Sequence, residues 1–414
     1  MKKIDSKSKE LFILKMTNTE LLFFLPFEFD QIPREWYPWD DDWEEKKGRL
    51  FIYECFKNVP FDGLLISKSK FDTNQSRFSH LLKNNKKLKD AFSIPKNIKL
   101  FGDCGAFQYR NEEKPPYTAQ EILNYYQDHG FDMGCSIDHI ITNKKDVSER
   151  EKRYKITKDY AKECIELYNE KNYTFELFGV AQGWDIQSYS QIVEFLLELG
   201  YENLCIGGLV GLNKKKIESE NDLTLENLLV KLKPKFKNFK RVHIFGRGNI
   251  EYLPLFIDVG VTQFDNNVMR KSWTDEKKSY FLHHKEDRSM KYYTSIRLPL
   301  TNNKQGTQEL DEKIFNDLRD FSNNGMNIQD FILSLKNFYE KYNKLNKKKY
   351  ELNENLMTKL LMETPWKKCE CDLCRKYQIH VCVFRRRMRN MSRGFHNVYN
   401  YFSLLKDIRS AQHY

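Results

Sequence analysis

The sequence predicts an α/β fold, a closed (β/α)8 TIM barrel, followed by a smaller helical region that contains a cysteine cluster. Eight short apolar stretches alternate with amphipathic helical stretches, and this alternation stops after residue 265. Alternating strands and helices imply parallel pairing, because tight hairpins cannot join parallel strands. Eight such units favour a closed barrel over a doubly wound sheet.

The predicted strands are the short apolar runs, which lie near residues 21–26, 63–67, 98–103, 133–137, 175–181, 203–207, 241–245 and 261–265. Apolar residues at helical spacing predict helices over 77–92, 118–130, 147–171, 186–200, 224–233 and 249–259. The acidic and aromatic stretch 27–45 is expected to be an irregular loop. Residues 266–306 are polar and predicted to be irregular, and 307–365 are predicted to be helical and highly charged.

Composition sets the broad class of the protein. The chain has 414 residues and is 40% hydrophobic, enough for a barrel-sized domain with an appendage or for two domains. No window approaches the ~18 consecutive apolar residues of a membrane span. The charged N-terminus lacks the apolar core of a signal peptide, so we expect a cytoplasmic protein without a membrane partner. Its nine cysteines are then expected to be reduced thiols or metal ligands, not disulfides.

Polar residues and glycines follow most of the predicted strands. The active site of such a barrel lies at the C-terminal ends of its strands. The residues expected there are Asp103, Phe107, Gln108, Asp138, Gln182, Gly207, Gly208 and Asp265. The strand near 241–245 also ends in a polar and glycine-rich corner, Phe245-Gly246-Arg247-Gly248. Each corner alone has a structural explanation, such as a helix cap or a turn, but six such strand ends together favour a functional site.

This set of residues suits a flat heterocycle that forms hydrogen bonds. Phe107 can stack on such a ring, while Asp138, Gln182 and the glycine backbone can meet the polar groups along its edge. The remaining pair, Asp103 and Asp265, suits glycosyl chemistry, in which one carboxylate attacks the anomeric carbon and another moves protons.

A metal site is predicted near the C-terminus. Cys369, Cys371 and Cys374 form a C-x-C-x2-C array, which is typical of a tetrahedral zinc site. The fourth ligand has three candidates in the sequence: His380, Cys382 and His396. The other cysteines are expected to be small core residues and not ligands. These are Cys55, Cys104, Cys135, Cys164 and Cys205.

Positive charge is concentrated in the same region. Between Lys367 and Arg409 there are eleven basic residues and three acidic ones, a net charge of +8 out of +11 for the chain. A basic helix there would bind phosphates, and the alternative is an ordinary solvated helix face. The candidate nucleic-acid-binding residues are Arg270, Arg385, Arg386, Arg387, Arg389 and Arg393.

The order of these motifs resembles the tRNA-guanine transglycosylase superfamily over roughly residues 95–405. Asp103-Cys-Gly-Ala-Phe-Gln resembles the family's D-S-G-G-F/Y-Q box, Gly179-Val-Ala-Gln-Gly its G-I-V-Q-G corner, and Ile206-Gly-Gly-Leu its G-G-L corner. Phe264-Asp265 falls where the family carries its nucleophile. The cysteine array with Phe395-His396-Asn397 resembles its zinc site, which makes His396 the fourth ligand.

The resemblance implies a barrel with a zinc-binding subdomain near the C-terminus and one structural zinc ion. We therefore divide the chain into N-terminal barrel strands with a divergent loop region (1–95), a catalytic barrel core (96–306) and a helical zinc-binding subdomain with a closing basic helix (307–414). The implied reaction replaces guanine in a nucleic acid by a 7-deazaguanine. Asp265 would form a covalent glycosyl-enzyme, Asp103 would act as general acid and base, and the base would be bound by the remaining residues of the site.

Departures from the family pattern indicate which branch the chain resembles. Cys104 and Ala106 replace a serine and a glycine of the first box, and the usual opening of the tRNA enzymes is missing. This pattern resembles the DNA-guanine transglycosylase (DpdA) branch of 7-deazaguanine DNA modification systems, whose expected base is 7-cyano-7-deazaguanine (preQ0). The alternatives are the same exchange on tRNA and a non-catalytic subunit that positions nucleic acid. A homodimer and a companion modification-system protein remain open as partners.

Overall fold

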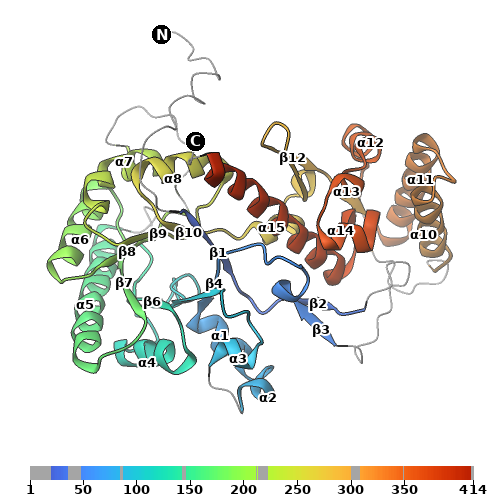
Figure 1. Ribbon diagram of the computed structural model, residues 1–414. Helices are drawn as coiled ribbons and strands as arrows, with labels where there is room; N and C mark the ends of the chain where they lie inside the picture. The colour runs from blue at the N-terminus through green and yellow to red at the C-terminus, as the bar shows by residue number, and fades with distance from the viewer. Residues whose placement is uncertain are drawn as a thin grey trace, which may run out of the picture. The chain divides into compact units, whose positions relative to one another are not determined.

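A computed structural model describes residues 20–35, 48–83, 87–141, 146–210, 212, 222–299, 308–347 and 349–411. Eight strands form the predicted closed barrel in the order β1-β10-β9-β8-β7-β6-β5-β4 (Figure 1). They are β1 (Leu22–Pro26), β4 (Gly63–Ser67), β5 (Lys99–Asp103), β6 (Met133–Cys135), β7 (Glu176–Ala181), β8 (Asn203–Ile206), β9 (Arg241–Ile244) and β10 (Gln263–Asp265). All eight lie where the sequence predicted strands, so the predicted fold class is confirmed.

Every neighbouring pair of barrel strands is parallel, and β1 closes the barrel. Phe24 in β1 pairs with Asp265 in β10 on one side and with Gly63 in β4 on the other. Large apolar side chains fill the core of the barrel, among them Phe24, Phe101 and Phe178. Parallel pairing in this register places the C-terminal ends of all eight strands at one end of the barrel.

Helices follow the strands, and Figure 1 shows α4, α5, α6 and α7 on the outer side of the barrel. The bounds are α1 (Lys68–Gln75), α2 (Ser79–Leu82), α3 (Leu88–Ala91), α4 (Ala119–His129), α5 (Val147–Lys171), α6 (Ile186–Glu198), α7 (Leu225–Phe236) and α8 (Leu253–Val259). Side chains cap four of these helices at their N-termini, which satisfies backbone N–H groups that have no partner inside the helix. The caps are Thr118, Asp146, Asp185 and Thr224.

The chain divides into two compact units. The barrel unit comprises residues 1–29, 61–267 and 408–414, and the second unit comprises 30–60 and 268–407. The chain therefore leaves the barrel after β1 and again after β10. Among the described residues, no helix is both long enough and apolar enough to cross a membrane.

The second unit contains short strand pairs and helices. Its strands are β2 (Gln31–Pro33), β3 (Arg49–Phe51), β11 (Tyr280–His284), β12 (Ser289–Tyr293), β13 (Ile296–Arg297) and β14 (Val383–Phe384). Its helices are α9 (Lys271–Thr274), α10 (Gln308–Ser322), α11 (Ile328–Asn346), α12 (Glu354–Glu363), α13 (Pro365–Lys368), α14 (Asp372–Tyr377) and α15 (Arg386–Ser410), whose last residues belong to the barrel unit.

Two predictions of irregular structure were wrong in part. Residues 31–33 pair with β3, and residues 280–293 form an antiparallel hairpin. Most of β12 is only half-buried, so its polar residues hide the strand pattern in the sequence. Residues 36–47 of the predicted loop lie outside the described residues.

Arg409 attaches the end of α15 to the barrel unit. Its guanidinium is buried, donates a 2.8 Å hydrogen bond to the Leu21 carbonyl and pairs with Asp62. The Asp62 carboxylate also accepts the backbone N–H of Phe23 in β1 at 2.8 Å. Arg409 is therefore part of a buried network that holds the first barrel strand.

We expect Arg409→Ala to lower the free energy of unfolding by about 3 kcal/mol, because it leaves a largely buried carboxylate without its partner. Urea denaturation followed by circular dichroism measures this loss. The control Lys406→Ala removes an exposed cation from the same helix and should change stability by less than about 0.5 kcal/mol. Equal effects of the two substitutions would contradict the assigned role of Arg409.

Candidate active site and metal centre

The predicted site residues of the barrel lie at the C-terminal ends of its strands. Asp103 and Asp265 are the last residues of β5 and β10. Asp138 follows β6, Gln182 follows β7, and Gly207 and Gly208 follow β8. Burial raises the pKa of Asp103 most, and the carboxylates of Asp138 and Asp265 raise it further, so both acids lie within electrostatic reach of Asp103.

Asp138 and Gln182 form a buried polar cluster. Gln182 Nε2 donates to Asp138 Oδ2 at 2.5 Å, and the Cys104 thiol donates to Asp138 Oδ1 at 3.1 Å. Burial raises the pKa of Asp138. Among the described residues, the buried Oε1 of Gln182 has no hydrogen-bond partner, so it can accept a hydrogen from a bound molecule.

The Gly207-Gly208 backbone lies directly against this cluster. A Cβ at Gly207 would be 2.4 Å from Gln182 Nε2, and one at Gly208 would be 2.5 Å from Gln182 Oε1. Gly208 also has a φ of +74°, which favours glycine. The Tyr189 hydroxyl fixes the backbone by donating to the Gly207 carbonyl at 2.8 Å. Positions 207 and 208 therefore cannot carry a side chain while Gln182 keeps this position.

One oxygen of the buried Asp265 carboxylate is held by two groups. The Gly246 N–H donates to Oδ1 at 2.8 Å, and His243 Nε2 lies 3.1 Å from the same atom. Burial lowers the pKa of His243, which keeps the ring neutral and makes Nε2–H the donor. This arrangement orients the carboxylate and leaves its second oxygen for chemistry.

Sequence reasoning missed His243, whose neighbours in β9 are apolar. Its ring lies 4.8 Å from that of Phe101 and 4.7 Å from that of Phe245, measured between centroids. A lone histidine in an apolar strand is usually a core residue. The pairing of β9 with β10 would have indicated a functional role for His243, because His243 pairs with Gln263 and therefore lies beside the strand that carries Asp265.

Asp103 is partly exposed at the end of β5, yet its carboxylate is poorly solvated. Burial raises its pKa to about 7, and the charges of Asp138 and Asp265 contribute to the rise. A carboxyl group with this pKa exchanges protons readily at neutral pH, as a general acid and base must.

Phe107 and Gln108 lie on the loop after β5 and are exposed. The Phe107 side chain is 51% exposed, and the Arg110 guanidinium lies 4.2 Å from its ring centroid. The loop is held from inside by the buried Arg153 of α5, which donates to the Arg110 carbonyl at 2.8 Å and contacts His139 Nδ1 at 2.8 Å. The structure thus presents Phe107 as an accessible stacking surface and does not enclose it.

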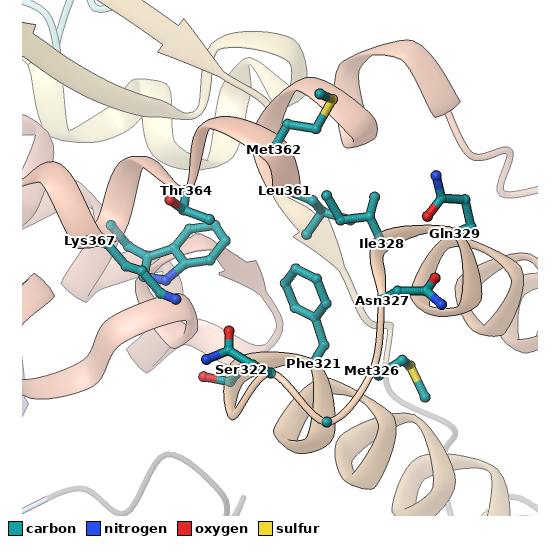
Figure 2. Close-up of a pocket in the computed structure, with 13 residues that line it drawn as sticks. Phe321, Ser322, Met326, Asn327, Ile328, Gln329, Leu361, Met362, Thr364 and Lys367 are labelled. Atoms are coloured by element: carbon teal, nitrogen blue, oxygen red, sulfur yellow. The ribbon is translucent and has the colours of Figure 1, made fainter.

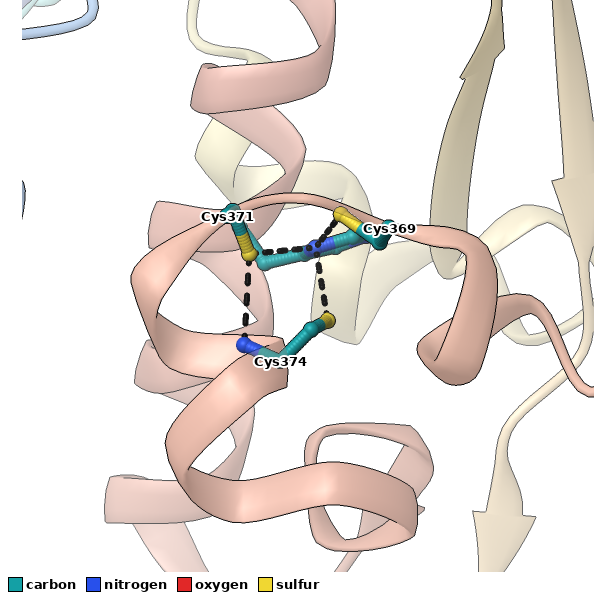
Figure 3. A group of neighbouring side chains, drawn as sticks. Cys369, Cys371 and Cys374 are labelled. Carbon is teal, nitrogen blue, oxygen red and sulfur yellow. Dashed lines mark hydrogen bonds between the residues drawn. The ribbon is translucent and has the colours of Figure 1, made fainter.

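The second unit contains the predicted metal-binding group. Cys369, Cys371, Cys374 and His396 are all buried, and one potential ligand atom from each lies within 4.8 Å of the others. Figure 3 shows the three cysteines close together. His396 Nδ1 is 3.3–3.5 Å from their three sulfur atoms. His380 and Cys382, the other candidates for fourth ligand, are not in this group.

A hydrogen bond prepares His396 for metal binding. Its Nε2 lies 2.6 Å from the Phe281 carbonyl, an acceptor, so Nε2 carries the proton and Nδ1 presents a lone pair to the sulfurs. Tyr280 stacks on the ring with a centroid distance of 4.0 Å. Three thiols and an oriented imidazole fit a tetrahedral metal ion.

The predicted nucleic-acid-binding arginines do not share one surface. Arg385, Arg389 and Arg393 are buried. Arg393 donates to the carbonyls of Val383 and Ser272, and Arg385 pairs with Asp311. The prediction that these three arginines contact phosphates is therefore corrected, because their side chains are buried inside the second unit. Arg270, Arg386 and Arg387 are exposed.

A cavity of about 520 Å³ lies elsewhere in the second unit, between the α10–α11 turn and α12 (Figure 2). Phe321, Ile328 and Leu361 contribute apolar surface to it. None of its lining residues is a carboxylate, cysteine or histidine, so we assign no catalytic role to this cavity.

Comparison with known proteins identifies relatives along most of the chain. Residues 87–412 match the protein family described as queuine tRNA-ribosyltransferase. A DNA-guanine transglycosylase from Salmonella montevideo is 31% identical over 393 residues, covering 87% of this chain and 90% of that protein. A tRNA-guanine(15) transglycosylase from Nanoarchaeum equitans is 26% identical, covering 59% of this chain and 52% of that protein. A tRNA-guanine(15) transglycosylase from Methanocaldococcus jannaschii is 28% identical, covering 40% of this chain and 25% of that protein.

The raised pKa of Asp103 predicts a specific pH dependence of stability. The folded-state value is about 7, whereas an aspartate in the unfolded chain titrates near pH ~4. Between these values the unfolded state loses a proton that the folded state keeps. The stability that neutral Asp103 contributes is therefore complete below the unfolded-state pKa and is lost as the pH rises through the folded-state pKa.

We expect the melting temperature of Asp103→Asn, relative to the unsubstituted protein, to rise from about pH 4 to about pH 7 and to level off above. Thermal denaturation at a series of pH values measures it. Asp258→Asn, at an exposed position on α8, is the control and should show no such trend. A difference for Asp103→Asn that does not vary with pH would contradict the assigned environment.

Proposed function

Because the chain belongs to the queuine tRNA-ribosyltransferase family and is a guanine transglycosylase, a pentosyltransferase, we propose that it exchanges guanine in DNA for a 7-deazaguanine base. The observation that carries the choice of DNA is the extent of similarity. The relative named DNA-guanine transglycosylase aligns along 87% of the chain, whereas two relatives named as tRNA enzymes align along 59% and 40%. The proposed incoming base is 7-cyano-7-deazaguanine.

In the proposed mechanism, Asp265 is the nucleophile. Its free oxygen attacks C1′ of the target nucleotide, so that a C1′–O bond forms as the C1′–N9 bond to guanine breaks. The Gly246 N–H and His243 hold the other oxygen, which fixes the angle of attack without neutralising the carboxylate. Attack by the incoming base breaks the C1′–O bond, and two successive displacements retain the configuration at C1′.

Asp103 is the proposed general acid and base. It gives a proton to the departing guanine and later takes the N9 proton of the incoming base, which returns it to its starting state. Its pKa of about 7 suits both steps at neutral pH. The base would lie against Phe107, with its edge on Asp138, Gln182 and the backbone at Gly208, where the lack of a side chain lets Gln182 approach the backbone closely.

The buried cysteines and His396 are the proposed ligands of one structural zinc ion. Such an ion would connect α14 and α15, which carry Cys374 and His396, with Cys369 and Cys371 in the segment before α14. It stabilises the fold of the second unit and takes no part in the exchange reaction.

Two alternative functions are base exchange on tRNA, which some observations support, and a non-catalytic role, which the site residues oppose. Exchange on tRNA uses the same site and agrees with the family description and two relatives. A non-catalytic subunit that positions nucleic acid would not need a carboxylate at both Asp103 and Asp265. The presence of both, with Asp265 held in a defined orientation, supports an active enzyme.

We expect Asp265→Ala and Asp103→Ala each to reduce incorporation of labelled 7-cyano-7-deazaguanine into duplex DNA by at least about 1,000-fold. The reason is the loss of the nucleophile in one case and of the proton carrier in the other. Circular dichroism should show both proteins folded, and Asp258→Ala, at an exposed acid nearby in sequence, should retain activity. Robust incorporation by Asp265→Ala would rule out the mechanism.

The same assay distinguishes the two nucleic acids. Purified protein, labelled base and either duplex DNA or tRNA are incubated in parallel. The proposal predicts label in DNA and none in tRNA. Label in tRNA alone would replace the proposal by the tRNA reaction.

Metal analysis tests the zinc centre. We expect Cys371→Ser to lower the zinc content from about one ion per chain to well below one, and to lower the melting temperature. Loss of a residue that hydrogen-bonds to a metal ligand typically lowers metal affinity by about 10–100-fold, and loss of a ligand itself should lower it further. The matched control is Cys382→Ser, a buried cysteine of the same unit outside the group. Full zinc content in Cys371→Ser would contradict the assignment.

A further inference from the structure

Two cysteines that the sequence suggested were core residues lie beside a proposed catalytic acid. Asp103, Cys104 and Cys135 each offer one potential ligand atom, and these atoms lie within 4.8 Å of one another. The strand register explains this, because Gly102 in β5 pairs with Gly134 in β6, which puts Asp103 and Cys135 at the same level. Among the described residues, this group and the proposed zinc centre are the two that could hold a metal ion.

Packing alone does not account for these two thiols. Cys104 has polar neighbours, since the Tyr109 hydroxyl donates to its sulfur at 2.9 Å and its thiol donates to Asp138. The Cys135 sulfur lies 3.9 Å from Asp103 Oδ1 and 3.9 Å from the Tyr126 hydroxyl, both long contacts. By contrast, Cys164 and Cys205 are equally buried but lie outside the group.

The donor set selects a class of ligand. Two sulfurs and one carboxylate oxygen suit a thiophilic divalent cation such as Zn²⁺ and not Mg²⁺ or Ca²⁺, which prefer oxygen ligands. Three protein ligands leave the fourth tetrahedral position open. Asp138 Oδ1 is 3.1 Å from the Cys104 sulfur but is not part of this group.

We propose that Asp103, Cys104 and Cys135 form a second cation site, which takes a thiophilic divalent cation and inhibits base exchange by occupying the Asp103 carboxylate. The inhibition rests on the proposed role of Asp103 in proton transfer, whereas the cation site does not. As the cation binds, each thiol releases its proton to solvent. Because both thiols must lose their protons to bind the cation, binding strengthens as the pH rises.

Cobalt distinguishes this site from the zinc centre. Protein with its zinc centre filled is freed of chelator and titrated with Co²⁺, which does not displace Zn²⁺ because it binds such ligands more weakly. We expect a cobalt–thiolate charge-transfer band in the unsubstituted protein and in Cys164→Ser, the matched buried control. Cys135→Ser should lose the band or need at least about 100-fold more Co²⁺ to develop it.

Activity supplies the second measurement. Zn²⁺ added to the zinc-loaded protein should inhibit incorporation of labelled base into DNA, and Cys135→Ser should need at least about tenfold more Zn²⁺ for the same inhibition. Absence of the cobalt band, or equal bands in Cys135→Ser and Cys164→Ser, would overturn the site. A band without inhibition would overturn the inhibitory role. If no protein exchanges base in DNA, the proposed function fails while the cobalt band still decides the cation site.

Discussion

The candidate active site depends on the parallel pairing of the barrel strands. Because all eight strands run the same way, the residues at their C-terminal ends meet at one end of the barrel although they lie up to 162 positions apart in the sequence. β1 is the closing element, since Phe24 pairs with both β10 and β4. This closure brings Asp265 on β10 within electrostatic reach of Asp103 on β5. A slipped strand would separate the two acids that the proposed chemistry requires.

Different surroundings give the two acids different proposed tasks. The Asp265 carboxylate receives hydrogen bonds from a backbone N–H and from the neutral His243 on one oxygen, which orients the proposed nucleophile. Asp103 has poor solvation and two acidic neighbours, and its pKa of about 7 favours proton exchange. Enzymes commonly separate acid–base roles by environment in this way. The same crowding brings the Cys104 and Cys135 thiols to Asp103, which explains how a cation could compete with the reaction.

The barrel could be predicted well from the sequence, because the spacing of apolar residues within each strand or helix, and the alternation of strands with helices, can be read from short stretches of chain. All eight strands were placed correctly, and the cysteine array with His396 was found from spacing and resemblance. Long-range register was not predictable from these signals, so His243 and the Cys104–Asp138 contact were missed. Charge counts misplaced Arg385, Arg389 and Arg393, because a basic run does not reveal which side chains hydrogen-bond to buried carbonyls. The 280–293 hairpin was missed because half-buried strands carry little apolar pattern.

The central claim is a covalent bond between Asp265 and deoxyribose in DNA, and intact-protein mass spectrometry can detect it. The protein is mixed with duplex DNA and quenched with denaturant before a replacement base is added. The account predicts a protein–DNA adduct in which C1′ of a base-free deoxyribose of the DNA strand is bonded to Asp265, with guanine released, and predicts none with Asp265→Asn. An adduct on another residue, or full base exchange without any adduct, would contradict the account.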